Sequence, residues 1–160
     1  MNKYIYILLL IIFGLKVHSY ADSYKGIKKI DMEVFRNGEV IGYSNYFFDQ
    51  TDNRVIIKNH TKFTVELFGV SVFSISSEAI ETYENDELIY FKSNTFQNDK
   101  KKYVNLNYDQ SLKKLIINGS SYKGEASTDC IVGNWWNHKI LKANCQISPL
   151  SGSIKDQIVT

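Results

Sequence analysis

A period of two, rather than a helical period, dominates the pattern of side chains from residue 28 onward, although the positions between those of the main face are mixed. In residues 54–69, RVIIKNHTKFTVELFG, every second side chain from Val55 to Leu67 belongs to one face. A period of two is the signature of a β-strand with one buried face, and about seven such segments follow one another. The predicted strands are residues 28–36, 39–49, 54–69, 70–84, 87–97, 101–108 and 112–119.

Short turn signals separate these segments. Asn37-Gly38 lies between two β-rich runs and predicts a hairpin, because a type I′ turn needs positive φ at both central residues. Asn85-Asp86 and Asn98-Asp99 mark further turns. Consecutive strands joined by tight turns favour an antiparallel meander over a parallel sheet. We therefore predict an all-β fold whose meander forms a large curved sheet or an incomplete barrel, with a short helical or irregular crossover near residues 133–141.

The N-terminal segment has the features of a secretory leader. Residues 4–15, YIYILLLIIFGL, are apolar and follow Lys3, but a helix that spans a bilayer needs about 20 such residues. Ser19 and Ala21 offer small side chains for cleavage before Asp22. We expect a signal peptide at residues 1–21, one domain at 22–160 and export to the periplasm or the extracellular space. No membrane span remains after cleavage; an uncleaved N-terminal anchor is the alternative.

Charge argues against nucleic acid as a partner. The chain has 19 Lys and Arg against 17 Asp and Glu, and loss of Lys3 and Lys16 with the leader leaves 17 of each. Nucleic-acid binding usually requires a cationic excess. The one basic run, residues 100–102, is interpreted as a solvated turn in preference to a binding patch.

Cys130 and Cys145 are the only cysteines. In an oxidising compartment two cysteines are typical of one disulfide, although free buried thiols are the alternative. His138 lies between them, but the spacing lacks the close ligand pairs of structural zinc sites. We therefore predict a disulfide, no metal and no cofactor.

No catalytic residue can be assigned. There is no G-x-S-x-G motif, and His60 falls inside a predicted strand. Five carboxyls crowd one segment, and a glycosidase-type pair needs two of them facing a cleft. A charged hairpin end is the preferred interpretation of this group. Its members are Glu78, Glu81, Glu84, Asp86 and Glu87.

Trp135, Trp136 and Asn137 are the candidate ligand-binding residues. Two adjacent tryptophans can stack on a sugar or cover a hydrophobic groove. The alternative, which we prefer, packs one indole into the core and the other over a sheet edge.

Three stretches together resemble a known family. They are EVFRNGEVIGYSNYFF, ETYENDELIYFKSNTFQNDKKKYVN and NWWNHKILKANCQISPLSG, and they span residues 33–154 or so. They resemble the signatures of an exported bacterial family, the domain of unknown function numbered six-one-three-four. His138 stands where that family often has proline, and members commonly continue into further strands, so the chain looks short at its C-terminus. The resemblance implies a large curved antiparallel sheet in an envelope protein, and no catalytic residue.

The leading hypothesis is a non-enzymatic exported β-protein that binds an apolar or amphipathic ligand, such as a lipid. One alternative is an envelope-directed hydrolase that uses the carboxyls of residues 78–87 with Trp135 and Trp136. Another is a structural or assembly subunit, suggested by a sheet edge that the last strands would otherwise cover. The sequence leaves the oligomeric state open.

Overall fold

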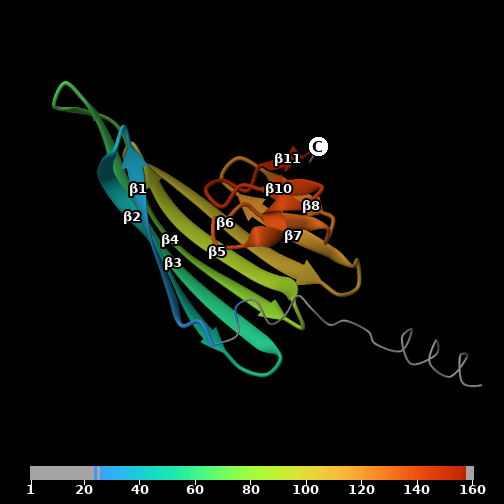
Figure 1. The fold of residues 1–160 in the computed structure, drawn as a ribbon. Coiled ribbons are helices and arrows are strands. Elements are labelled where there is room, and N and C mark those ends of the chain that lie inside the picture. Colours follow the sequence, from blue (N-terminus) through green and yellow to red (C-terminus); the bar gives the residue numbers. More distant parts are fainter. Residues whose placement is uncertain (1–23, 25, 158–160) are drawn as a thin grey trace, which may run out of the picture.

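The computed structural model describes residue 24 and residues 26–157, so the predicted signal peptide lies outside the described residues. Eight strands form one large sheet, and three more form a small one (Figure 1). The strands of the large sheet are β1 (Lys29–Arg36), β2 (Glu39–Gln50), β3 (Arg54–Leu67), β4 (Val70–Glu84), β5 (Glu87–Gln97), β6 (Lys100–Asp109), β7 (Lys114–Gly119) and β8 (Lys123–Ala126). Those of the small sheet are β9 (Cys130–Val132), β10 (Cys145–Ile147) and β11 (Ile154–Asp156).

The large sheet confirms the predicted meander. Each strand pairs antiparallel with the next in sequence, in the order β1 to β8, and the sheet does not close. Two-residue turns with positive φ join the first six strands at Asn37-Gly38, Phe68-Gly69, Asn85-Asp86 and Asn98-Asp99, apart from the longer turn at residues 51–53. Three of these four turns carry asparagine at the first position, as the left-handed conformation prefers.

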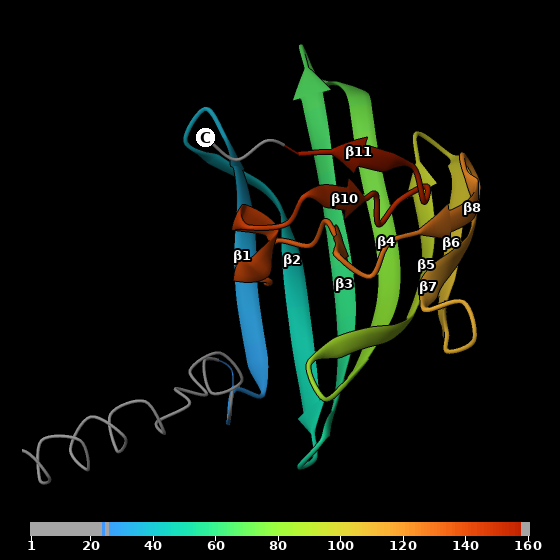
Figure 2. The ribbon, with the colours of Figure 1, turned by 90° about the vertical axis from the view of Figure 1, so that its right-hand side faces the viewer.

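The large sheet curves, and the C-terminal segment lies in its hollow (Figures 1 and 2). The side chains that face this segment alternate along each strand with those that face away. On β3 the inward set is the one predicted from the sequence as far as Val65, and it includes Ile57, which is fully buried. Leu67, which the alternation also placed on this face, is exposed beyond a register shift after Val65. The core therefore sits between the concave face and the C-terminal segment.

The small sheet holds that segment together. β9 and β10 pair in parallel, with Cys130 opposite Cys145, and β10 and β11 pair antiparallel. Cys130 and Cys145 form the disulfide that the sequence predicts. A 3₁₀ helix at His138–Leu141 lies between β9 and β10, within the predicted crossover. The prediction of about seven strands missed β8 to β11, and the parallel pair departs from the antiparallel expectation.

A turn near the C-terminus docks on β7 through two glycines. A Cβ at Gly119 would lie 2.4 Å from the carbonyl oxygen of Ser151, and Gly152 has a φ of +80°. The amide of Ser121 donates to the Ser151 carbonyl at 3.0 Å. Larger side chains at either glycine would separate the turn from the sheet, since both backbones are in direct contact.

Two buried clusters lie under the C-terminal segment. The first, which we call the aliphatic cluster, joins β5 to β8 with the small sheet and comprises Phe91, Val104, Leu106, Leu115, Ile117, Ala126, Cys130, Val132 and Ile147. The second, the aromatic cluster, joins β2 to β4 with the crossover and comprises Tyr46, Phe48, Ile57, Tyr83 and Trp136.

Candidate functional site

A buried carboxyl group lies at the edge of the aromatic cluster. Glu81 belongs to β4, and strand alternation points it inward like Ser77 and Tyr83. Its side chain is only 1% exposed. An ionised carboxylate is costly to bury without compensation, so its partners decide what it does.

Three donors surround the Glu81 carboxyl. The Trp136 indole Nε1–H donates to Oε1 at 3.0 Å, and the Asn134 amide Nδ2–H donates to the same oxygen. The Tyr83 hydroxyl donates to Oε2 at 2.9 Å and accepts a bond from Asn137 Nδ2 at 3.4 Å. Residues 134, 136 and 137 all belong to the crossover. Glu81 therefore anchors the crossover to the large sheet.

Burial controls the protonation of this group. Desolvation raises the pKa of Glu81 to about 7, although the bonds from Trp136, Tyr83 and Asn134 oppose the rise. Burial also raises the pKa of the Tyr83 hydroxyl well above its usual value, and the neighbouring Glu81 charge adds to that rise. Glu81 consequently changes charge near neutral pH in the folded protein.

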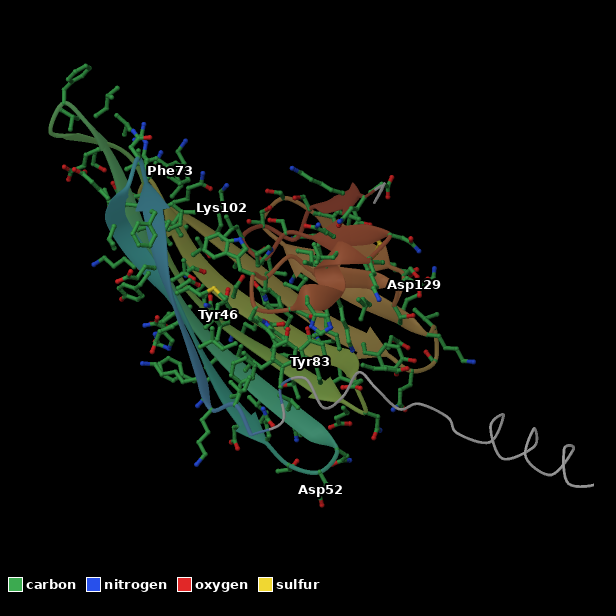
Figure 3. All side chains as sticks on the ribbon, in the orientation of Figure 1. Tyr46, Asp52, Phe73, Tyr83, Lys102 and Asp129 are labelled. Carbon is green, nitrogen blue, oxygen red and sulfur yellow. A yellow bond between two sulfur atoms is a disulfide. The ribbon has the colours of Figure 1, made fainter. Side chains whose placement is uncertain are left out.

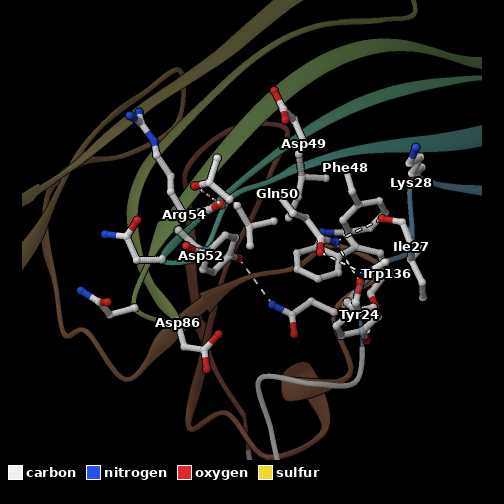
Figure 4. A pocket seen from close by; sticks show the side chains of 18 of the residues that line it. Tyr24, Ile27, Lys28, Phe48, Asp49, Gln50, Asp52, Arg54, Asp86 and Trp136 are labelled. Carbon is white, nitrogen blue, oxygen red and sulfur yellow. Dashed lines mark hydrogen bonds between the residues drawn. The ribbon is translucent and has the colours of Figure 1, made fainter.

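An open pocket of about 890 Å³ lies beside this carboxyl (Figure 4). Its apolar lining is supplied by the aromatic cluster and by residues that pack on it, namely Tyr24, Ile27, Phe48, Val55, Ile57, Tyr83 and Trp136. Its rim is charged and carries both signs, from Lys28, Asp49, Asp52, Arg54, Asp86 and Lys139. Glu81 does not line the pocket, but it bonds Trp136 and Tyr83, which do.

The segment before β1 forms one side of the pocket. The Gln50 amide Nε2 donates to the carbonyls of Tyr24 and Ile27, at 2.8 and 3.1 Å (Figure 4). The Tyr24 hydroxyl donates to the Trp136 carbonyl at 2.8 Å and lies 2.7 Å from His138 Nδ1. The Tyr24 ring stacks on Phe48, with centroids 6.3 Å apart. Polar and aromatic contacts thus tie the segment to both β2 and the crossover.

A family profile described as Domain of unknown function (DUF6134) matches residues 32–160. The chain belongs to this family. The resemblance carried by the three sequence motifs is therefore confirmed. No curated protein and no solved structure matches the chain.

In this DUF6134 chain the three candidate ligand-binding residues lie in different environments. Trp136 is buried and lines the pocket, and Asn137 lines it too, while its side-chain oxygen accepts a bond from the Lys139 amide at the start of the 3₁₀ helix. Trp135 is 57% exposed and does not line the pocket. One indole therefore packs in the core, as the preferred interpretation expected.

The five carboxyls of residues 78–87 are spread over β4, the turn that follows it and the start of β5. Glu78 is exposed on the opposite face of β4 from buried Glu81, and Glu84 pairs with Arg54 at 3.8 Å. Asp86 belongs to the rim of this pocket, and it also lines a second, smaller pocket together with Glu87, which begins β5. The buried Glu81 is not one of the two carboxyls that line this second pocket.

Within residue 24 and residues 26–157, no group of three or more His, Cys, Asp or Glu side chains is arranged to hold a metal ion. None of the helices in that part of the chain is long and apolar enough to cross a membrane.

Sequence reasoning missed the special position of Glu81 and the role of Tyr24, Phe48 and Gln50. Alternation along β4 indicates that Glu81 shares a face with Ile75 and Tyr83, and a glutamate on such a face is unusual. No comparable signal identifies Tyr24, because it reaches the pocket from outside the strands.

Proposed function

We propose that this DUF6134 chain is an exported, non-enzymatic β-sheet protein that binds an amphipathic ligand in the pocket beside Trp136. The observation that carries the proposal is an open pocket of about 890 Å³ with an aromatic and aliphatic lining and a charged rim. Small-molecule sites are typically concave, largely apolar and about 300–1,000 Å³ in volume.

The lining favours a ligand with an apolar chain or ring. Phe48 and Tyr83 present their rings edge-on to Trp136, with centroids 5.5 and 5.9 Å away. This arrangement leaves ring faces and edges that an apolar ligand can contact. Each Å² of apolar surface that the ligand buries there contributes about 25 cal/mol to the free energy of binding. The interior of the pocket therefore suits the hydrophobic part of the ligand.

The rim favours a polar head that is neutral or zwitterionic. Lys28, Arg54 and Lys139 contribute positive charge, and Asp49, Asp52 and Asp86 contribute negative charge. Because the opening carries both signs in equal number, a head with one strong charge would meet repulsion as well as attraction. A lysophospholipid with a choline head has the matching chemistry.

Two features support export. The leader-like residues 4–15 precede small residues at a cleavage position, and the Cys130–Cys145 disulfide is typical of an oxidising compartment. A fractionation of producing cells tests this part directly. Recovery of the protein in the periplasm or medium, with Asp22 at its N-terminus by mass spectrometry, is expected; retention in the cytoplasm with an intact leader would refute it.

Ligand binding is tested on the protein purified from expression of the full chain. Native mass spectrometry should detect a bound lipid-sized adduct, and the fluorescence of the uncharged dye Nile red should rise on binding. Ile27→Glu, which places a charge in the pocket lining, should abolish both signals. Ile30→Glu is the matched control, because Ile30 packs on the same cluster but does not line the pocket.

Protein recovered repeatedly without an adduct, and without dye uptake, would overturn the proposal. Equal loss of binding in both variants, with equal loss of stability, would show that the lining residues only support the fold.

A further inference from the structure

The hairpin between β3 and β4 extends beyond the rest of the large sheet. β2 pairs with β3 only up to Gly42 opposite Phe63, and β5 pairs with β4 only from Gln97 opposite Ile75. The last β3–β4 pairs, from Thr64 opposite Ser74 to Leu67 opposite Val70, have no third strand beside them. Figure 1 shows this two-stranded ribbon, residues 64–74, projecting past the other turns.

The tip of the ribbon is apolar and exposed. Phe68 is 96% exposed and Val70 63%. Leu67 and Val72 are each 49% exposed. Isolated exposed apolar residues are ordinary, but a contiguous group on a projecting element marks an interaction site. Further down, Phe63 and Phe73 are diagonal neighbours on the paired strands, and their ring centroids lie 6.0 Å apart (Figure 3, where Phe73 is labelled).

Turn formation does not account for the phenylalanine at the tip. Phe68 has a φ of +51°, the left-handed conformation that bulky residues rarely adopt. The equivalent position in the other three two-residue turns is Asn37, Asn85 or Asn98. Asparagine suits that conformation, and phenylalanine does not. Strain of this kind at an exposed side chain points to a functional role for the ring.

Cations flank the ribbon base on both sides. Arg36 and Lys62 are exposed on the β3 side, and the Arg36 guanidinium donates to the Glu66 carbonyl at 3.4 Å. Lys100 and Lys101 are exposed on the β4 side, where the Asn98 side-chain oxygen accepts from the Ser74 amide at 2.8 Å. Four acidic residues lie at the same end, Glu33, Glu39, Glu66 and Asp99. The cations, which also include Lys102, therefore exceed them by one.

We propose that the tip of the ribbon inserts into the interfacial region of an anionic phospholipid bilayer, with the flanking cations against the headgroups. A shallow apolar wedge with basic residues around its base is the arrangement that interfacial membrane binding requires. The site is separate from the pocket beside Trp136, because the turn at residues 68–69 and the pocket-lining turns at 51–53 and 85–86 lie at opposite ends of the meander.

The test is co-sedimentation with large unilamellar vesicles of phosphatidylglycerol and phosphatidylcholine in equal parts, and with phosphatidylcholine vesicles alone. Wild type should partition onto the anionic vesicles and much less onto the neutral ones, and added salt should weaken binding. Phe68→Asn should weaken partition by about ten- to a hundredfold, which is the contribution expected for burial of one aromatic side chain.

Phe68→Asn should retain the fold, because asparagine occupies the equivalent position in the other three two-residue turns. A change in vesicle binding therefore reports the loss of the ring and not unfolding. Leu112→Asn is the matched control: Leu112 is 53% exposed in the turn after β6, at the other end of the meander. It should bind vesicles like the wild type. Phe68→Trp should show a blue shift of the added emission on anionic vesicles and quenching by lipids brominated on the acyl chain.

Absence of wild-type partition, or equal partition of wild type and Phe68→Asn, would overturn the proposal. So would concentration-dependent self-association that Phe68→Asn removes without any vesicle binding, because the tip would then dock on a second copy. Ile27→Glu should leave vesicle binding unchanged, which separates this inference from the proposed pocket.

Discussion

The two buried clusters under the C-terminal segment differ in what they contain. The aliphatic cluster is built from side chains with no ionisable group, it has fully buried members such as Phe91 and Val104, and the disulfide closes it. The aromatic cluster borders a buried carboxyl and opens into a pocket. The small sheet covers the aliphatic cluster and the crossover covers the aromatic cluster, so the two halves differ both in their side chains and in the backbone that closes them.

That contrast separates stability from function. A dry apolar cluster contributes to folding through burial alone, and its contribution is nearly independent of pH. A buried carboxyl whose pKa is displaced destabilises the ionised folded state, and such groups concentrate at functional sites. The aromatic cluster therefore contributes less to the free energy of folding at neutral pH, because it borders an ionisable carboxyl and is open to a pocket.

The largest expected effect is in the aliphatic cluster. Phe91→Ala removes a fully buried ring and should lower the free energy of unfolding by about 3–5 kcal/mol. The loss should be the same at pH 5 and pH 8, because no ionisable group belongs to the cluster. Urea unfolding at the two pH values measures it. A loss that changed markedly with pH would mean that the two clusters are not independent.

The aromatic cluster should respond to pH instead. The pKa of Glu81 is raised from 4.5 in the unfolded chain to about 7 in the folded protein, so the folded state binds the extra proton between these values. Its contribution is fully favourable below pH 4.5 and is lost as pH rises through 7. Between pH 5 and pH 8 the wild type should lose about 2–3 kcal/mol through this group.

Glu81→Gln isolates that contribution. The amide oxygen can accept from Asn134 and Trp136, and the amide nitrogen can donate to the Tyr83 hydroxyl, as a protonated carboxyl does. The variant should be more stable than the wild type by about 3 kcal/mol at pH 8 and by about 1 kcal/mol at pH 5. Denaturant unfolding of both proteins between pH 5 and pH 8 checks the difference. If the stability difference between variant and wild type did not change with pH, Glu81 would not be the group that titrates.

A smaller effect is expected from the indole that links Glu81 to the pocket. Trp136→Phe keeps an aromatic ring but removes the N–H that donates to Glu81, and should cost about 1–2 kcal/mol. Trp135→Phe is the control, because Trp135 is exposed, and it should change stability by less than about 0.5 kcal/mol. Thermal unfolding of the two variants compares them. Equal losses would remove the distinction between the two tryptophans.

The meander was predictable because its determinants are local. Asn37-Gly38, Asn85-Asp86 and Asn98-Asp99 each specify a turn, and alternation along β3 indicates its inward face. β9 to β11 were not predictable, since strands of three residues show no period and exist only through pairing between distant segments.

The candidate site was predictable only in part. Trp136 and Asn137 attracted attention through composition, and both line the pocket. The sequence alone does not distinguish Glu81 from the four other carboxyls of residues 78–87. Only the tertiary structure shows that the crossover covers the face of β4 that carries Glu81. Tyr24 joins the site across more than a hundred residues of sequence, through its bonds to Trp136 and His138, and no local pattern encodes such a contact.

The most direct measurement of ligand binding beside Trp136 is quenching of that residue by a lysophosphatidylcholine whose acyl chain is brominated. Trp135→Phe leaves Trp136 as the single tryptophan, and the zwitterionic head of this probe is the kind that the rim favours. Saturable quenching of Trp136 emission is expected, together with its loss when Ile27→Glu is added and its retention when Ile30→Glu is added. Emission that stays unchanged at every probe concentration would contradict a ligand site beside Trp136.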